Sequence, residues 1–289
     1  MIEGIMHIAR LRTSPGPVIV TVMDWSKGKA WGRITVLAVA LAAALQFPGL
    51  AVAASDIQEA QTGTPSNRTI IENFNIIAFG NEYTGRRYET VRKWRQPILV
   101  GIEGKVPKYF ETFVLQHIRD LRRITGHPIR LYYSPAMHKE GRLAPDFDRT
   151  KINLILYYLP VERIPNRLKR YFDGDEAKVR KMIEVSTCFA RFGTRKNEIR
   201  WAIAVFPDHH PKDYIRACLV EEMTQVLGLP NDSNAVKPSI FNDQSRYFEL
   251  TAHDRLMLKM LYDPRITVGM ARRDALGMGR VILDQLRER

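Results

Sequence analysis

Short apolar runs recur along the chain and are separated by turn residues. Runs at 98–102, 129–133 and 152–159 predict β-strands. The third run, INLILYYL, is apolar almost throughout, so we expect a central strand that is buried on both faces. Two more runs, at 187–192 and 199–206, flank the turn sequence GTRKN and predict a β-hairpin.

Between these strands, apolar positions recur at helical spacing. Residues 109–124 and 211–227 each predict an amphipathic helix, and residues 161–185 predict a helical region with a break near its middle. A capping-box pattern, Thr251 with Asp254, predicts the start of a further helix, whose first turn should leave His253 exposed. The pattern indicates an α/β (α+β) fold, in which a mixed sheet carries packed helices and helices also follow residue 250.

The most apolar run, ITVLAVALAAAL at 34–45, has the length of a signal-peptide core and is too short to span a bilayer. Basic residues precede it, and the small residues AVAA at 51–54 follow it, as signal peptidase requires. We therefore expect a signal peptide over 23–54 and no integral membrane span after its cleavage. The competing interpretation is an uncleaved anchor.

Three further segments follow from this interpretation. Residues 1–22 precede a signal peptide that is complete from Met23, so we interpret them as an extension from a start codon assigned too early. Residues 55–69 are poor in apolar side chains and should form a flexible segment. The remaining residues, 70–289, are expected to form a single domain, because no linker interrupts them.

Charge narrows the class of partner. The chain has a net charge of +13, and loss of residues 1–53 removes five basic and two acidic residues, which leaves +10. Such a charge favours encounter with anionic partners. The basic residues are scattered, however, and lack an aromatic-interleaved motif, so we expect no nucleic-acid partner.

Both cysteines, Cys188 and Cys218, lie after the signal peptide. An even number of cysteines in an oxidising compartment indicates a disulfide. Two buried free thiols are the alternative.

The helix over 211–227 carries the most specific motif of the chain. Its final part, EEMTQVLGLPN at 221–231, has the spacing of HExxHxxGxxH, in which three histidines bind zinc and the glutamate activates water. Glu222 and Gly228 occupy the glutamate and glycine positions. Glu221, Gln225 and Asn231 occupy the three histidine positions.

These substitutions leave two interpretations of the motif open. Glu221, Gln225 and Asn231 are either metal ligands, a harder set than imidazole and suited to calcium or magnesium, or a polar helix face and a C-terminal cap. Glu222 is either a general base or a carboxylate at the rim of a packed helix. Two more histidines, His209 and His210, precede the helix and could supply nitrogen ligands, although adjacent loop histidines are more often solvated. The sequence thus does not fix a cofactor, whether zinc or another divalent metal.

Several segments together resemble a known group. They are FNIIAFGNEY, RKWRQPILV, CFARF, EEMTQVLGLPND, SIFND and LTAHDRLMLKMLYDPRI. Over about residues 70–270 the chain resembles a bacterial exported family catalogued as a domain of unknown function and regarded as metzincin-like with a degenerate metal motif. The resemblance implies a zincin-like fold and no established reaction. The stretch SIFND lacks the methionine that metzincins place in the turn beneath the metal.

Two classes of function follow. The sequence favours a periplasmic or secreted protein that is not catalytic, a pseudo-peptidase that binds a peptide, a polymer or an envelope protein. The alternative is a metal-dependent hydrolase or peptidase with atypical ligands and Glu222 as its general base.

Overall fold

The computed structural model describes residues 65–81, 85, 87–242, 244 and 247–288. All of them belong to one compact unit. The expected extension over 1–22 and the expected signal peptide over 23–54 lie outside the described residues. No helix in the described part of the chain is long and apolar enough to cross a membrane.

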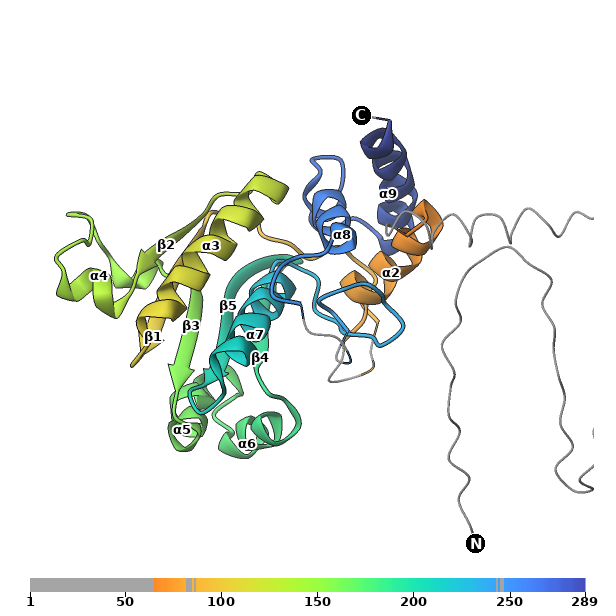
Figure 1. Ribbon diagram of the computed structural model, residues 1–289. Helices are drawn as coiled ribbons and strands as arrows, with labels where there is room; N and C mark the ends of the chain where they lie inside the picture. Colours follow the sequence, from red (N-terminus) through yellow and green to blue (C-terminus); the bar gives the residue numbers. More distant parts are fainter. Residues whose placement is uncertain (1–64, 82–84, 86, 243, 245–246, 289) are drawn as a thin grey trace, which may run out of the picture. The chain divides into compact units, whose positions relative to one another are not determined.

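The five described strands form one mixed sheet in the order β2-β1-β3-β5-β4 (Figure 1). They are β1 Ile98–Gly104, β2 Ile129–Tyr133, β3 Leu154–Leu159, β4 Phe189–Arg195 and β5 Glu198–Pro207. The pairs of β1 with β2 and β3, and of β3 with β5, are parallel, and β4 runs antiparallel to β5 at the edge. The strand predictions and the hairpin are confirmed, and so is the mixed α/β (α+β) class.

The alternating side chains of β3 enter two separate cores. Leu154, Leu156 and Tyr158 belong to the larger core, and Tyr157 belongs to a smaller one on the other face. Successive side chains of a strand point to opposite faces, so a nearly continuous apolar run is what a strand buried on both sides needs. The central position predicted for this strand is therefore correct.

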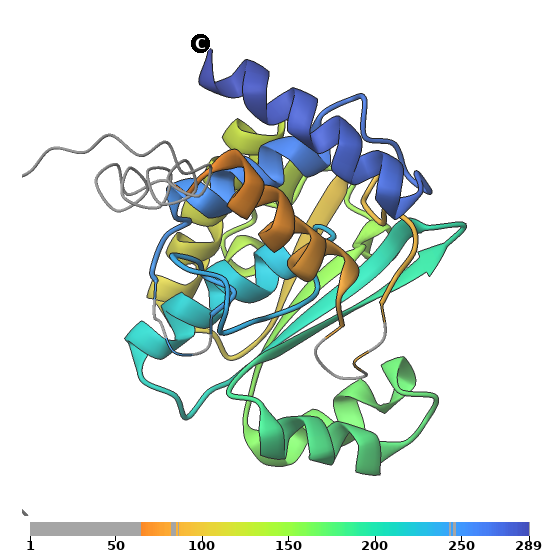
Figure 2. The same ribbon diagram turned by 90° about the vertical axis from the view of Figure 1, so that its right-hand side faces the viewer.

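Helices cover both faces of the sheet. They are α2 Asn67–Phe79, α3 Lys108–Thr125, α4 Pro135–Lys139, α5 Ile164–Leu168, α6 Glu176–Val185, α7 Lys212–Gln225, α8 Ala252–Tyr262 and α9 Arg272–Arg287. In Figure 1, α3 and α7 lie across the front of the sheet, and α5 and α6 lie at its lower end. Figure 2 shows α2 and α9 side by side, well away from α5 and α6.

Ordered structure begins slightly earlier than the sequence suggests. The helix α2 starts at Asn67, within the segment expected to be flexible, because the Ser66 hydroxyl accepts a hydrogen bond from the amide of Thr69 at 3.1 Å. The helix then buries Ile70 and Phe74 against the core. A side-chain cap and an apolar face thus order the residues just before Ile70.

Candidate functional site

The motif helix α7 is buried around most of its circumference. Its apolar side chains lie in the core as predicted, together with the two residues that follow the helix: Ile215, Leu219, Val220 and Met223, then Val226 and Leu227. On the side predicted to be polar, Gln225 is only 5% exposed, as is Glu222 at the border. Glu221 is half-buried. The expected polar face is therefore packed against other parts of the chain.

Two of the three histidine-equivalent side chains are held by hydrogen bonds to different partners. The Gln225 side-chain amide donates to the Asp232 carboxylate at 2.8 Å, within the turn that follows the helix. The Asn231 side-chain amide donates to the Ile76 carbonyl oxygen at 3.1 Å, near the end of α2. These contacts give Gln225 and Asn231 roles in joining segments of the backbone.

Asn231 also lies flat against a glycine. A Cβ atom placed on Gly80, the residue that ends α2, would stand 2.6 Å from the Asn231 Cγ atom. Real side chains do not approach so closely, so the end of α2 and the Asn231 amide are in direct contact because residue 80 has no side chain. Asn231 is thus a clamp on α2 in this structure.

The retained glycine of the motif has a structural cause. Gly228 has a φ of +118°, and a Cβ atom there would stand 2.1 Å from the carbonyl oxygen of Arg92. Only glycine accepts both the backbone angle and the close approach. The glycine spacing of the motif therefore reflects a tight turn against the segment that precedes β1.

Two aromatic side chains hold the end of the motif helix: Trp94, which is buried, and Tyr262, which is half-buried. The Trp94 indole donates to the carbonyl oxygen of Val226 at 2.8 Å, and the Tyr262 hydroxyl donates to that of Leu227 at 2.9 Å. The last carbonyls of a helix have no partner within the helix, so these bonds satisfy groups that would otherwise be buried without one. Sequence reasoning assigned no such role to Trp94 or Tyr262.

A second buried polar network lies beside this turn. The carboxylate of Asp254, which is fully buried, accepts hydrogen bonds from the Ser239 hydroxyl at 2.6 Å, the Ile240 amide at 3.2 Å, and the amide and hydroxyl of Thr251 at 2.9 and 2.8 Å. The predicted capping box is confirmed. The carboxylate also anchors the turn at 239–242, which the capping pattern did not indicate.

The exposure expected for His253 is wrong. Its side chain is fully buried, and its ring nitrogens lie 3.3 Å from the Pro238 carbonyl oxygen and 3.4 Å from the Asn73 side chain. Both partners are distant in sequence, so the helical pattern around His253 carried no sign of them. The first turn of α8 is therefore part of the core.

A buried histidine links the motif helix to α3. The His117 Nε2 atom lies 3.1 Å from the Thr224 hydroxyl oxygen. Burial lowers the pKa of His117 to about 3, so the ring is neutral at neutral pH. The buried side chain of His117 thus forms a polar contact between α3 and α7 within the core.

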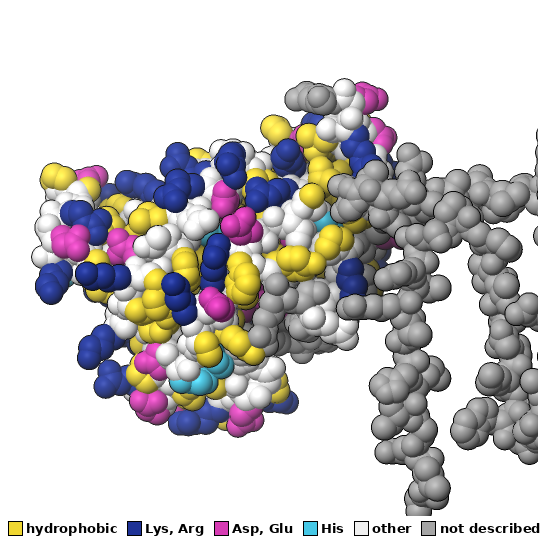
Figure 3. Space-filling view, viewed as in Figure 1, with side chains coloured by type: hydrophobic (Ala, Val, Ile, Leu, Met, Phe, Trp, Pro, Cys, Tyr) yellow, Lys and Arg dark blue, Asp and Glu magenta, His cyan; other side chains and the backbone are white. Residues whose placement is uncertain are grey.

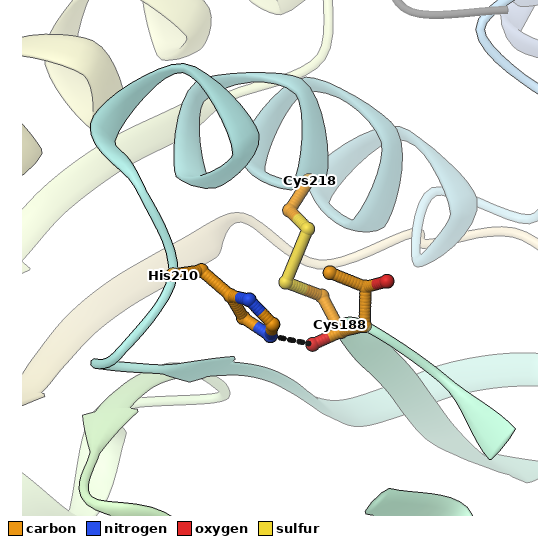
Figure 4. The surroundings of a disulfide bond; sticks show 4 residues. Cys188, His210 and Cys218 are labelled. Atoms are coloured by element: carbon orange, nitrogen blue, oxygen red, sulfur yellow. Dashed lines mark hydrogen bonds between the residues drawn. A yellow bond between two sulfur atoms is a disulfide. The ribbon is translucent and has the colours of Figure 1, made fainter. Parts of the chain in front are cut away.

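The disulfide joins the motif helix to the edge strand. Cys188, immediately before β4, is bonded to Cys218 of α7 (Figure 4). The prediction of a disulfide is confirmed, and the alternative of two free thiols is not. The covalent bond fixes α7 against the outer strand of the sheet.

The two adjacent histidines lie near this bond. The His210 Nε2 atom is 3.1 Å from the carbonyl oxygen of Thr187, at the start of the segment that leads into β4 (Figure 4). Burial lowers the pKa of His210, and so does the neighbouring His209. The rings of His209 and His210 contact each other with centroids 4.0 Å apart, and His209 is exposed.

A catalytic zinc site of the metzincin kind does not match these side chains. In such a site three histidine nitrogens hold the zinc and a fourth position stays open for water. In the part of the chain that the structure describes, no three or more His, Cys, Asp or Glu side chains are grouped so that they could hold a metal ion. The amides of Gln225 and Asn231 are instead engaged with Asp232 and with α2.

A known protein family matches most of the chain. A family described as "Protein of unknown function (DUF2927)" matches residues 67–278. No curated protein matches the chain.

Proposed function

The chain belongs to the family of unknown function DUF2927, and we propose that it is an exported, zincin-like domain that acts by binding and not by hydrolysis. In this proposal the side chains at the former ligand positions of the motif hold neighbouring segments of the fold together. The protein works in the periplasm or outside the cell and binds a peptide, a polymer or an envelope protein.

The contact of Asn231 with α2 carries the proposal. A third metal ligand must direct its side chain to the same point as the two ligands on the helix. Here the Asn231 amide donates to the Ile76 carbonyl oxygen and lies against the backbone of Gly80. A ligand position that clamps two segments together favours a scaffold role for the motif.

Two further observations support a zincin-like origin and export. A motif with the glutamate and glycine positions retained ends a helix that packs on a mixed sheet, which is what the sequence resemblance implies. The disulfide between Cys188 and Cys218 suits an oxidising compartment, because such bonds are rare in the cytosol.

The experiment that tests the proposal is elemental analysis of the purified protein, combined with thermal unfolding in zinc, in calcium and in a chelator. We expect no stoichiometric metal and the same unfolding temperature in all three solutions, because a ligand that binds the native state would raise that temperature. The variants Glu221→Ala and Gln225→Ala should give the same result for metal content.

One set of results would overturn the proposal in favour of the hydrolase alternative. It is stoichiometric metal in the wild-type protein that is lost in Glu221→Ala or Gln225→Ala, together with a hydrolytic activity that Glu222→Gln removes. Glu222→Gln is nearly isosteric, so loss of activity in that variant would point to proton transfer and not to packing.

The clamp itself gives a separate prediction. Asn231→Ala should lower the free energy of unfolding by about 1 kcal/mol, because it removes a hydrogen bond and the contact with Gly80. Asn234→Ala is the matched control, since that side chain is exposed only three positions away. Its effect should stay within about 0.5 kcal/mol in denaturant unfolding. Equal effects of the two substitutions would contradict the clamp.

A further inference from the structure

A second region with the features of a ligand site lies at the far end of the sheet from α2 and α9. It is an open cavity of about 710 Å³ at the carboxyl ends of β1 and β3, closed on one side by the first turns after β3. We call it the β1/β3 cavity. It is independent of the motif helix and of the function proposed for it.

The topology of the sheet makes this a favoured place for a ligand. From β1 the chain passes through α3 to β2, at one edge of the sheet. From β3 it passes through α5 and α6 to β4, at the opposite edge. The helix α3 packs in the larger core, while α5 and α6 pack in the smaller core on the opposite face. Neighbouring parallel strands whose connections leave in opposite directions open a crevice at their carboxyl ends, where α/β proteins commonly bind ligands.

The floor of the cavity is bare backbone at the end of β1. Gly104 has a φ of +116°, and a Cβ atom there would stand 1.9 Å from the Tyr158 carbonyl oxygen of β3. Glycine is therefore required at this point, and it leaves no side chain over the ends of the two strands.

Cationic side chains surround the cavity. Arg163, Arg167, Lys169 and Arg170 line it, against the carboxylates of Glu103 and Glu162. Figure 3 shows Lys and Arg side chains along the lower left edge of the viewed face, near the end of the sheet where α5 lies. Lys169 is paired with Glu176 at 3.2 Å, outside the cavity lining.

The carboxylate of Glu103 is already neutralised by two arginines. It accepts hydrogen bonds from Arg149, at 2.8 Å, and from Arg167. Burial opposes its ionisation, but these two guanidinium groups lower the pKa of Glu103 below its ordinary value. Glu103 thus offsets one of the two positive charges of Arg149 and Arg167, and both of its oxygens are engaged.

Neither Arg170 nor Arg163 forms an ion pair with a carboxylate among the described residues. The Arg170 guanidinium donates to the hydroxyl oxygens of Tyr157 and Tyr171, at 2.9 and 2.7 Å. Burial raises the pKa of Tyr157, so this phenol stays neutral and orients Arg170 without cancelling its charge. The Arg163 side chain makes no hydrogen bond or ion pair with the residues that the structure describes, and it is exposed at the cavity.

We propose that the β1/β3 cavity binds a small ligand through an oxyanion, a carboxylate or a phosphate, held by Arg163 and Arg170. Guanidinium groups match both anions by donating two parallel hydrogen bonds. The orientation of Arg170 by two phenols reduces the side-chain freedom that binding would otherwise cost.

Calorimetric titration of the purified protein with inorganic phosphate and, separately, with citrate tests the proposal at constant ionic strength. We expect saturable binding of at least one of them at one site per chain. Phosphate alone would indicate a phosphorylated ligand, and citrate alone would indicate a carboxylate ligand. Arg163→Gln should weaken binding about tenfold or more, as expected for a charge-assisted hydrogen bond.

The matched control is Arg122→Gln, at the end of α3, where a different cluster of arginines lines the surface. It should leave the affinity unchanged. Arg170→Gln should also weaken binding, but because Arg170 holds two tyrosines, its unfolding midpoint must be measured as well; Arg163→Gln has no such complication. Absence of saturable binding of both anions in the millimolar range, or equal weakening by Arg122→Gln and Arg163→Gln, would overturn the proposal.

Discussion

Replacing Asp254 with alanine should lower the free energy of unfolding by about 4 kcal/mol, as measured by chemical denaturation followed by circular dichroism. The substitution removes the acceptor of four hydrogen bonds in a fully buried site. The amides of Ile240 and Thr251 would lose their partner. A buried donor without a partner raises the free energy of the folded state. The turn at 239–242 would also lose its hydrogen bonds to α8.

Two further variants separate the role of the carboxylate from that of its volume. Asp254→Asn keeps the size of the side chain but replaces one acceptor oxygen with a donor, so its stability should fall between those of the wild type and Asp254→Ala. Asp146→Ala, in an exposed loop, should change the stability by less than about 0.5 kcal/mol. Asp254→Ala with near wild-type stability would show that the network does not anchor the turn.

Removal of the disulfide is the second large effect that we expect. The double variant Cys188→Ala/Cys218→Ala should lose about 3.5 kcal/mol of stability under oxidising conditions, because the bond closes a loop of 30 residues in the unfolded chain. The loss should show as a lower denaturant concentration at the unfolding midpoint. The bond also ties α7 to the edge of the sheet, so the variant should expose this region to proteolysis first.

A reductant provides the control for the disulfide. Dithiothreitol should lower the midpoint of the wild-type protein to near that of the double variant and should leave the double variant unchanged. A thiol assay in denaturant, without reductant, should find no free thiol in the wild-type protein. Two titratable thiols and coincident midpoints of wild type and variant would contradict the bond.

The predictions that succeeded rest on local patterns. Side chains a few residues apart predicted the strands, the hairpin over 189–207 and the capping box of α8. Residues that are close in sequence are also close in the folded protein, so local patterns predict such elements well. The central place of β3 also followed from its own composition. The helix α2 was not predicted, and the ordered domain begins a few residues before the expected residue 70, since the cap at Ser66 lies in an otherwise polar segment.

The candidate site was predicted less well because its partners are distant in sequence. The side of α7 that carries Glu221 and Gln225 was interpreted either as metal ligands or as a polar helix face, yet Gln225 is buried. Trp94, which lies 132 residues before its partner Val226, holds the end of the helix. His253 was expected to be exposed and is covered by Asn73, 180 residues away.

The sequence by itself determined the five strands and the helices α3, α7 and α8, which positions of a metal-binding motif hold other residue types, and that an even number of cysteines is present. Only the tertiary structure decided that Cys188 meets Cys218, that Asn231 clamps α2, and that cationic side chains surround the ends of β1 and β3. Secondary structure depends on hydrogen bonds and spacing within a few residues, whereas a site depends on which distant surfaces the packed core brings into contact.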